Sequence, residues 1–249
     1  MSGHSKWATI KHKKAAVDKA RGKIFAKLAR QLEVSAKDGG GDPSTNASLR
    51  TIMLKAKAAQ MTNDAIDRAI KRGLGESGDT VFESITYEAY APGGVAMLID
   101  VLTDNRNRTA ADVRVIFSKL GGAMAEPGAV SWQFSRKGVL QVARSVNEDD
   151  LMSVALEKGA EDISDDGDSW RVTCESSIVY DLKAALDNSG MVVSSAISTM
   201  VSSMTVPITT LQDAKSVLRI MDELEENDDV QDVYANFDIP EEILMEAAL

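Results

Sequence analysis

The sequence predicts an α+β fold, with an N-terminal three-helix domain followed by two ferredoxin-like α+β domains, one of them inserted in the other. Three observations predict it. Apolar residues recur with a helical period up to about residue 75. Beyond that point, short β-rich runs alternate with amphipathic stretches and turn residues. One complete β-α-β-β-α-β order lies inside this second part, with unpaired elements on either side of it.

Three amphipathic helices account for the N-terminal part. Residues 13–37 place apolar side chains on one side and basic side chains roughly opposite. The Gly-rich stretch at 39–43 ends this helix, because glycine permits a left-handed cap and proline cannot continue the helix. A second helix is expected over about 45–61. A short third helix follows, with Asn63 as its N-cap and its end at Gly73.

Two strands, a helix and a third strand follow in residues 81–136. The strands at 81–91 and 95–103 flank a Pro-Gly-Gly turn. Residues 108–122 have the apolar row of a helix and end in a Gly-Gly pair, and residues 129–135 have the pattern of a strand. This set lacks the helix and strand that would complete an α+β sheet.

Residues 138–202 contain the complete β-α-β-β-α-β order. It runs from a strand at 138–143 through a helix capped by Asn147, an Asp-Gly hairpin and a second helix to a strand at 192–201. A last helix, and a last strand at 230–238, have no nearby partners and supply what the preceding set lacks. We therefore predict three domains: a basic helical domain of residues 1–78, a discontinuous α+β domain of residues 79–136 and 206–249, and an inserted ferredoxin-like domain of residues 137–205.

The composition is that of an ordinary globular protein in a reducing compartment. Hydrophobic residues make up 44% and charged residues 27% of the 249 residues. The single cysteine, Cys174, excludes an intramolecular disulfide. No apolar run reaches the length of a membrane span, and the N-terminus lacks the apolar core of a secretory signal. These features are compatible with a reducing compartment, and we expect no membrane partner.

Charge is distributed unevenly along the chain. Residues 1–75 hold 16 Lys/Arg and 6 Asp/Glu, a net charge of +10, whereas residues 76–249 hold 12 Lys/Arg and 32 Asp/Glu, a net charge of −20. Such asymmetry favours a portion that binds a polyanion, attached to an acidic body. A second interpretation is that the two parts of the chain attract each other.

The positive charge is concentrated in residues 3–30, which carry nine Lys/Arg and one acid, Asp18. Lysine is a point charge on a flexible stem, so this set suits phosphate contacts better than base recognition. Lys19, Lys23, Lys27 and Arg30 form a stripe roughly opposite the apolar row, and the alternative is a solvated helix face. Trp7 either stacks on a base or docks the basic arm. The predicted nucleic-acid-binding residues here are Lys6, Lys11, Lys13, Lys14, Lys19, Arg21, Lys23, Lys27 and Arg30.

A second cationic cluster precedes the helix predicted at 108–122. Arg106 and Arg108 alternate with asparagines at a helix start, where backbone N–H groups favour anions. Asn107 or Thr109 is the expected cap of that helix. We add the two arginines to the predicted nucleic-acid-binding residues. An equally good interpretation is a capped turn whose arginines pair with the acidic body.

No arrangement of residues typical of catalysis stands out. His4 and His12 are the only histidines, and neither has an orienting carboxylate close by in the sequence. Cys174 has the setting of a small buried side chain in a strand. The acidic pairs Asp165–Asp166 and Asp228–Asp229 lie at predicted turns, where we expect them to be solvated. The sequence therefore predicts no enzyme, no metal site, no cofactor and no small-molecule substrate.

Nearly the whole chain resembles the YebC/PmpR family. The resemblance is carried by the basic opening and by "GGGDPSTN", "YEAYAPGGVAMLIDVLTDNRNRTAADVRVIFSKLGG", "GAVSWQF" and "DDVQDVYANFDIP". It implies a helical N-terminal domain, two α/β domains and a cytoplasmic, non-enzymatic role in gene expression. The family includes bacterial proteins described as probable transcriptional regulators and a mitochondrial translational activator.

The resemblance leaves two functions open. One is a DNA-binding transcriptional regulator, although the sequence shows no clear helix-turn-helix signature. The other is a translation factor that binds rRNA on the ribosome and relieves stalling. A lysine-rich arm that tracks phosphates suits either nucleic acid. A third class, an adaptor whose basic domain binds an acidic protein, is the weakest of the three.

Overall fold

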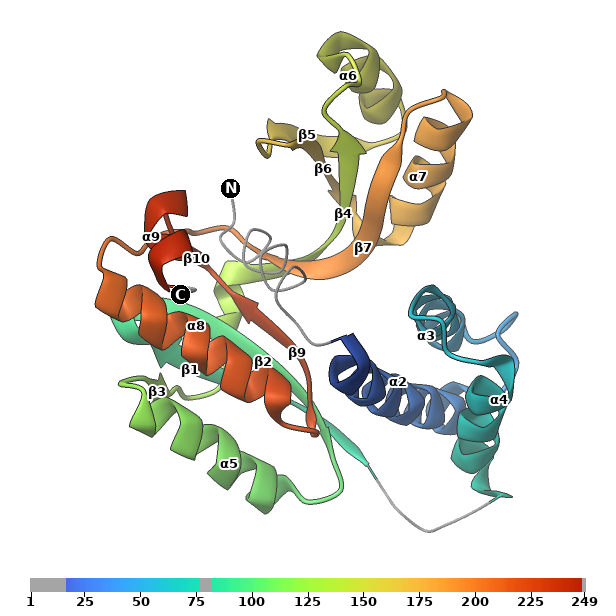
Figure 1. Cartoon of the computed structure of the whole chain (residues 1–249). Coiled ribbons are helices and arrows are strands. Elements are labelled where there is room, and N and C mark those ends of the chain that lie inside the picture. Colours follow the sequence, from blue (N-terminus) through green and yellow to red (C-terminus); the bar gives the residue numbers. More distant parts are fainter. Residues whose placement is uncertain (1–16, 77–81, 248–249) are drawn as a thin grey trace.

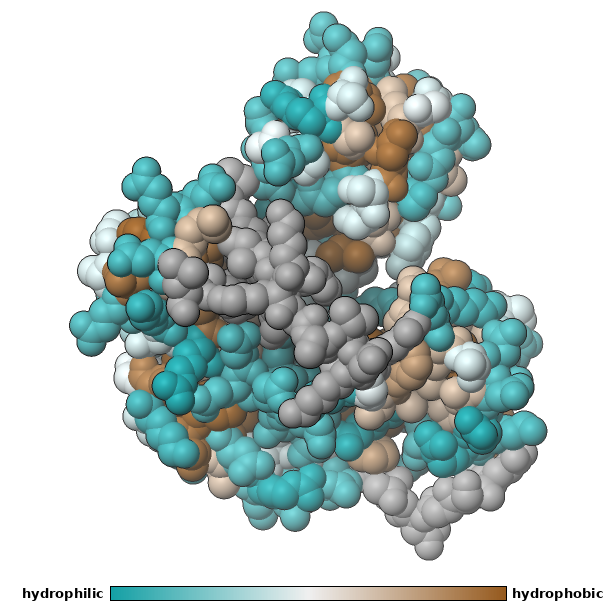
Figure 2. Space-filling model, in the orientation of Figure 1, coloured by the Kyte–Doolittle hydropathy of each residue, from teal (hydrophilic) through white to brown (hydrophobic). Residues whose placement is uncertain are grey.

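The computed structural model describes residues 17–76 and 82–247. They form a group of helices and two four-stranded sheets, each with its own helices (Figure 1). Among the helices of these two ranges, none combines the length and the hydropathy that a membrane-spanning helix requires. In the view of Figure 2, hydrophilic residues cover most of the surface and hydrophobic residues form smaller patches.

The helical group consists of three helices around one apolar core, as the sequence predicts. Leu32, Leu49 and Ile66 are fully buried and belong to the same cluster, one from each helix. The helices are α2 (Val17–Gly39), α3 (Ala47–Ala58) and α4 (Asn63–Lys71), and a π-helical turn follows at Arg72–Glu76.

The bounds of the second helix and the cap of the third differ slightly from the prediction. Asn46 caps α3: its side chain accepts the N–H of Leu49 at 3.0 Å and donates to the carbonyl of Ser35 at 2.7 Å. Asn46 therefore supplies an acceptor for a backbone N–H at the start of α3 and also links α3 to α2. Thr62 caps α4 in place of Asn63, because its hydroxyl accepts the backbone N–H three residues further on.

The first sheet joins two segments that lie far apart in the sequence. Its strand order is β3-β1-β2-β9, and β9 pairs antiparallel with β2. Two helices, α5 and α8, pack in one apolar core with this sheet, where Phe117 and Met221 are fully buried. The elements are β1 (Glu83–Ala91), β2 (Val95–Thr103), α5 (Arg106–Lys119), β3 (Ala123–Met124), α8 (Leu211–Glu226) and β9 (Val230–Ala235).

The second sheet follows the predicted β-α-β-β-α-β order. Its strands are antiparallel and lie in the order β5-β6-β4-β7, while α6 and α7 share one apolar core with it. The first sheet contains the same kinds of elements in a permuted order. Its strand β1 occupies the position that β6 has in the second sheet, but β1 comes first of its set in the chain whereas β6 comes third among the strands of its own. The elements are β4 (Phe134–Ala143), α6 (Glu148–Glu157), β5 (Ala160–Asp165), β6 (Ser169–Glu175), α7 (Val179–Asn188) and β7 (Val193–Ser202).

The segment before β4 is not the strand predicted at 129–135. Residues Ser131–Gln133 form a 3₁₀ turn, and a single strand, β4, runs on from Phe134. The buried side chain of Glu88 explains the difference. Its carboxylate accepts the N–H groups of Gly128, Val130 and Ser131 at 2.7, 2.6 and 3.0 Å. These N–H groups therefore cannot pair with a neighbouring strand.

The predicted strand at 230–238 is interrupted at Asn236. The buried Asn236 side chain accepts the N–H of Ala96 at 2.8 Å and donates to Gln133 at 3.1 Å. After Asn236 the chain no longer pairs with β2. The next strand, β10 (Phe237–Asp238), pairs in parallel with β8 (Val206–Pro207). A last helix, α9 (Glu241–Ala247), packs on α8.

Candidate nucleic-acid interface

The structure describes the side chains of five of the eleven predicted nucleic-acid-binding residues. Lys19 and Arg21 lie in the first turns of α2. Lys6, Lys11, Lys13 and Lys14 lie outside the described residues, as do His4, His12 and Trp7. The five described side chains are Lys23, Lys27 and Arg30 on α2 and Arg106 and Arg108 at the start of α5.

Lys23 and Lys27 reach across to the end of α8. The ammonium of Lys23 donates to the carboxylate of Glu226 and, at 3.0 Å, to its carbonyl. The ammonium of Lys27 donates to the carbonyl of Glu225 at 2.9 Å. Burial lowers the pKa of Lys27, and Glu225 is the main charge that opposes this effect. Two members of the cationic stripe therefore face the chain's own acidic segment.

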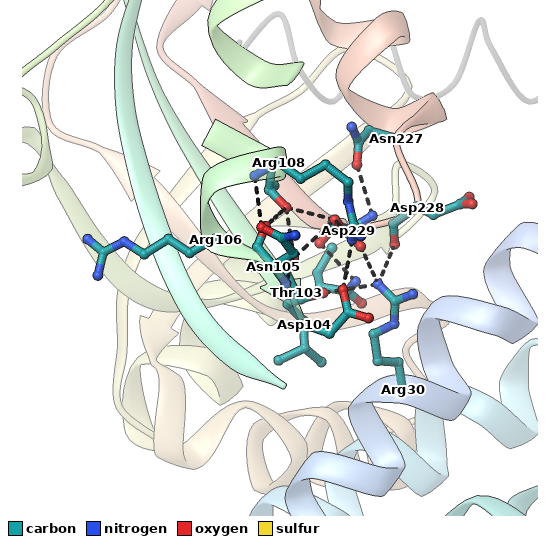
Figure 3. Close-up of polar contacts among 12 residues, drawn as sticks. Arg30, Thr103, Asp104, Asn105, Arg106, Arg108, Asn227, Asp228 and Asp229 are labelled. Carbon is teal, nitrogen blue, oxygen red and sulfur yellow. Dashed lines mark hydrogen bonds and ion pairs between the residues drawn. The ribbon is translucent and has the colours of Figure 1, made fainter. Parts of the chain in front are cut away.

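Arg30 makes the densest set of contacts between the helical group and the first sheet. Its guanidinium donates to the carbonyl of Leu102 at 3.0 Å, the carbonyl of Asp228 at 3.1 Å and the carboxylate of Asp229 at 2.8 Å. The same group lies over the ring of Phe82, 4.9 Å from the ring centroid. Figure 3 shows Arg30 pointing from α2 toward these partners.

Asp229 is the centre of a buried polar cluster (Figure 3). Besides Arg30, its carboxylate accepts Thr109 at 2.7 Å, Arg108 at 2.9 Å and Thr103 at 3.1 Å. Burial by itself raises the pKa of Asp229, but the hydrogen bonds from Thr109, Arg108, Arg30 and Thr103 outweigh it and hold the pKa below its usual value. The carboxylate is therefore charged at neutral pH.

The expectation that Asp228–Asp229 is a solvated pair is wrong for Asp229. Only its neighbour Asp228 is exposed, while 8% of the Asp229 side chain is accessible. The sequence does contain a local signal for this burial. Thr103 and Thr109 flank the Asn-Arg motif, and their hydroxyls need a buried acceptor when a strand and a helix bring them together.

The two arginines of α5 have different surroundings. The side chain of Asn105 caps the helix by accepting the N–H of Arg108 at 3.1 Å, so neither Asn107 nor Thr109 is the cap. Arg108 pairs with Asp104 at 2.8 Å as well as with Asp229, as the second interpretation of this cluster describes. Arg106 is exposed and points away from the cluster in Figure 3.

The described part of the chain offers no cluster of side chains suited to a metal ion. Within residues 17–76 and 82–247, no group of three or more His, Cys, Asp or Glu side chains is placed to hold a metal ion. Cys174 is buried in β6, and burial is the main cause that raises the pKa of its thiol. This thiol packs as a small apolar side chain, as its sequence context suggests.

Comparison with known proteins identifies the family. The model of the TACO1/YebC N-terminal domain matches residues 5–76, and the model of the TACO1/YebC second and third domain matches residues 82–237. The chain belongs to the TACO1/YebC family. The resemblance seen in the sequence motifs is thereby confirmed.

Bacterial members of the TACO1/YebC family match this chain over its length. A protein of Rubrobacter xylanophilus is 54% identical across the whole of both chains, and one of Geobacter sp. is 48% identical over 97% of this chain and 98% of its own. Both are named probable transcriptional regulatory proteins. A conserved hypothetical protein of Aquifex aeolicus, solved by crystallography, has a TM-score of 0.82 and 44% identity over 96% of this chain and 99% of that one.

These similarities confirm two predictions. The α+β architecture with an N-terminal helical domain is that of the solved relative. Membership of a family of regulatory proteins agrees with the prediction that this chain is not an enzyme. The predicted domain boundaries and the assignment of individual residues to nucleic acid stay predictions.

Proposed function

We propose that this TACO1/YebC protein is a cytoplasmic transcriptional regulator that binds DNA through its phosphates, using the basic N-terminal domain. The observation that carries the proposal is the segregation of charge: +10 in residues 1–75 against −20 in the rest of the chain. Contacts between basic side chains and phosphates favour binding, because each contact releases condensed counterions from the nucleic acid. The name of the Rubrobacter relative supports regulation of transcription as the biological role.

The helical group has further cations that suit the same role. Arg50, Lys55 and Lys57 on α3 are exposed and lie outside the basic opening segment. Arg50 keeps one hydrogen bond, to the carbonyl of Pro43 at 3.1 Å. We include these three residues in the proposed phosphate-binding surface, because long cationic side chains at a surface follow a polyanion without fixed geometry.

A second candidate function is binding to rRNA as a ribosome-associated translation factor that relieves stalling. One observation favours it: seven of the nine basic residues in the opening segment are lysines. Specific recognition of DNA bases relies mostly on bidentate arginine, asparagine or glutamine, whereas lysines contact the backbone of either nucleic acid.

A charge-reversal series tests the proposal. The test variant replaces Lys13, Lys14 and Lys19 with Glu. The matched control replaces Lys119, Lys158 and Lys215, which lie outside the basic domain and are exposed, with the same change in net charge. Binding to a fluorescent promoter duplex is measured with unlabelled competitor over a range of salt concentrations.

The two candidate functions give different results in this series. The proposal expects the test variant to lose duplex binding at least tenfold more than the control, and the wild type to retain a competitor-resistant complex. Sedimentation of cell extract in a sucrose gradient is run in parallel. Co-migration with ribosomes, together with duplex binding that competitor removes completely, would reject the DNA proposal in favour of rRNA. Equal losses in both variants would reject the basic domain as the binding surface.

A further inference from the structure

The cationic face of α2 already has an occupant in this structure, the acidic segment of residues 225–229. This segment presents a row of oxygen atoms, made up of two carboxylates and three main-chain carbonyls. Lys23, Lys27 and Arg30 donate to them along about two turns of α2. A nucleic-acid backbone would present anionic oxygens to the same donors, and one ammonium or guanidinium hydrogen cannot serve both.

We infer that the acidic segment 225–229 is an intramolecular competitor for the cationic face of α2, and that nucleic acid engages this face after the contact opens. The inference rests on the proposed function, because it assigns a regulation to the same phosphate-binding surface. It adds a closed state, held by the chain's own acidic residues, and an open state, in which phosphates take their place.

The composition of the contact allows it to open. In the described residues, the apolar cluster of the helical group and that of the first sheet are separate clusters. The contacts between them described above are hydrogen bonds, two ion pairs and the stacking of Arg30 on Phe82. In the pair of Lys23 with Glu226 the side chains are 28% and 67% exposed. Exposed ion pairs are individually weak and are screened by salt.

Asp229 also keeps its partners when Arg30 leaves. Thr103, Thr109 and Arg108 belong to the same α+β unit as Asp229 and continue to donate to its carboxylate. Opening therefore leaves no unpaired buried charge, which would otherwise make the open state costly. The polar cluster around Asp229 therefore stays intact when Arg30 detaches from it.

The first test weakens the acidic side without touching the proposed phosphate-binding residues. Glu226→Gln removes the carboxylate that faces Lys23. Glu223→Gln is the matched control, because Glu223 lies one turn earlier on α8 and pairs within its helix with Arg219 at 3.0 Å. The apparent dissociation constant equals the intrinsic constant divided by the open fraction. We expect Glu226→Gln to bind a fluorescent 24-base-pair DNA duplex about three- to fivefold more tightly at low salt, and the control to match the wild type.

The second test locks the contact. The side-chain amides of Gln31 on α2 and Gln231 on β9 meet across it at 3.2 Å, and neither residue is a proposed phosphate ligand. Gln31→Cys and Gln231→Cys are combined and joined by a short, cleavable bismaleimide, while the native Cys174 is buried. We expect the linked full-length chain to bind the duplex about tenfold more weakly. The slope of log affinity against log salt concentration should fall by the equivalent of up to about three phosphate contacts. Cleaving the linker should restore both values.

The outcomes separate this inference from the proposed function. If the duplex binds, but Glu226→Gln equals its control and the linked chain equals the cleaved one, the competition is refuted and the proposed function stands. If no variant binds the duplex at any salt concentration, the proposed function and the inference that depends on it are both refuted. A repeat with a duplex RNA of equal length shows whether the same face serves rRNA.

Discussion

The buried carboxylate of Asp229 gives the sharpest test of the structure, through the variant Asp229→Asn. Four side chains donate to this carboxylate within 3.1 Å: Thr103, Thr109, Arg108 and Arg30. An asparagine retains one acceptor oxygen, but its NH₂ group faces donors, so about half of these hydrogen bonds are lost. Each lost hydrogen bond at a buried site costs about 1 kcal/mol, and removal of the charge that faces two arginines adds to it. Solvent reduces the arginine share, so we expect a total of about 2–3 kcal/mol.

Amide hydrogen exchange is the suitable measurement, because a chain of several domains does not have one unfolding free energy. Exchange is followed by mass spectrometry in peptides from β2 and β9, which pair beside Asp229. A loss of 2–3 kcal/mol accelerates exchange through local opening about 30- to 150-fold. Asp228→Asn is the matched control. Asp228 is exposed and contributes a main-chain carbonyl to Arg30, so this change should leave exchange nearly unaltered.

The pH dependence of the same variant provides a second signature. The pKa of Asp229 is lower in the folded chain than its unfolded value of about 3.9. A group with a depressed folded pKa contributes stability that is fully present above the unfolded pKa and is lost as the pH falls through the folded pKa. The difference between wild type and Asp229→Asn should therefore be constant near neutral pH and shrink below about pH 4. Equal effects of Asp228→Asn and Asp229→Asn, or a difference that grows on acidification, would refute the role assigned to the cluster.

Three further predictions concern the sheets and α2. Glu88→Gln turns an NH₂ group toward the backbone donors of residues 128–131, so amide exchange in peptides from β1 and from this turn should show a local loss of about 2 kcal/mol, against less than about 0.5 kcal/mol for the same change at an exposed glutamate. Gly138→Ala places a Cβ 2.7 Å from the sulfur of Cys174, and we expect it to destabilise the second sheet by about 1–3 kcal/mol. A Cβ added at Gly22 on α2 would meet nothing within 4 Å, so Gly22→Ala should raise helix stability by about 0.5–1 kcal/mol. A loss of stability in Gly22→Ala as large as that in Gly138→Ala would contradict the open surroundings of Gly22.

The elements that the sequence predicts well are those set by local patterns. The strand predicted at 95–103 coincides with β2, because its apolar run lies between a Pro-Gly-Gly turn and a helix cap. The 3₁₀ turn before β4 was missed because its cause, Glu88, lies about 40 residues earlier in the sequence. The break of the last strand was missed for the same reason, since Asn236 is held by Ala96 and Gln133. Periodicity carries no information about such distant partners.

The candidate site shows the same division between local and distant information. Helical periodicity correctly placed Lys23, Lys27 and Arg30 together on one polar face of α2. It could not show which acceptor lies opposite, because residues 225–229 come about 200 positions later. The position of Asp229 in the fold, and not its residue type, makes it a buried acceptor. A projection of one helix therefore predicts a face, and only the assembled chain shows what that face contacts.

The uneven charge of the chain allowed two interpretations, a bound polyanion or attraction between its own two parts. They exclude each other only if every cation has a single partner. In this structure the middle of α2 faces the acidic segment, whereas Arg50, Lys55 and Lys57 on α3 are exposed. An arrangement of this kind gives weak initial attraction through the exposed cations and a stronger complex once the α2 face is released. Because phosphate affinity and interdomain attraction both fall with salt, the salt dependence of binding alone cannot separate them. Their separation requires the acidic side to be altered while every cation stays in place, as Glu226→Gln does.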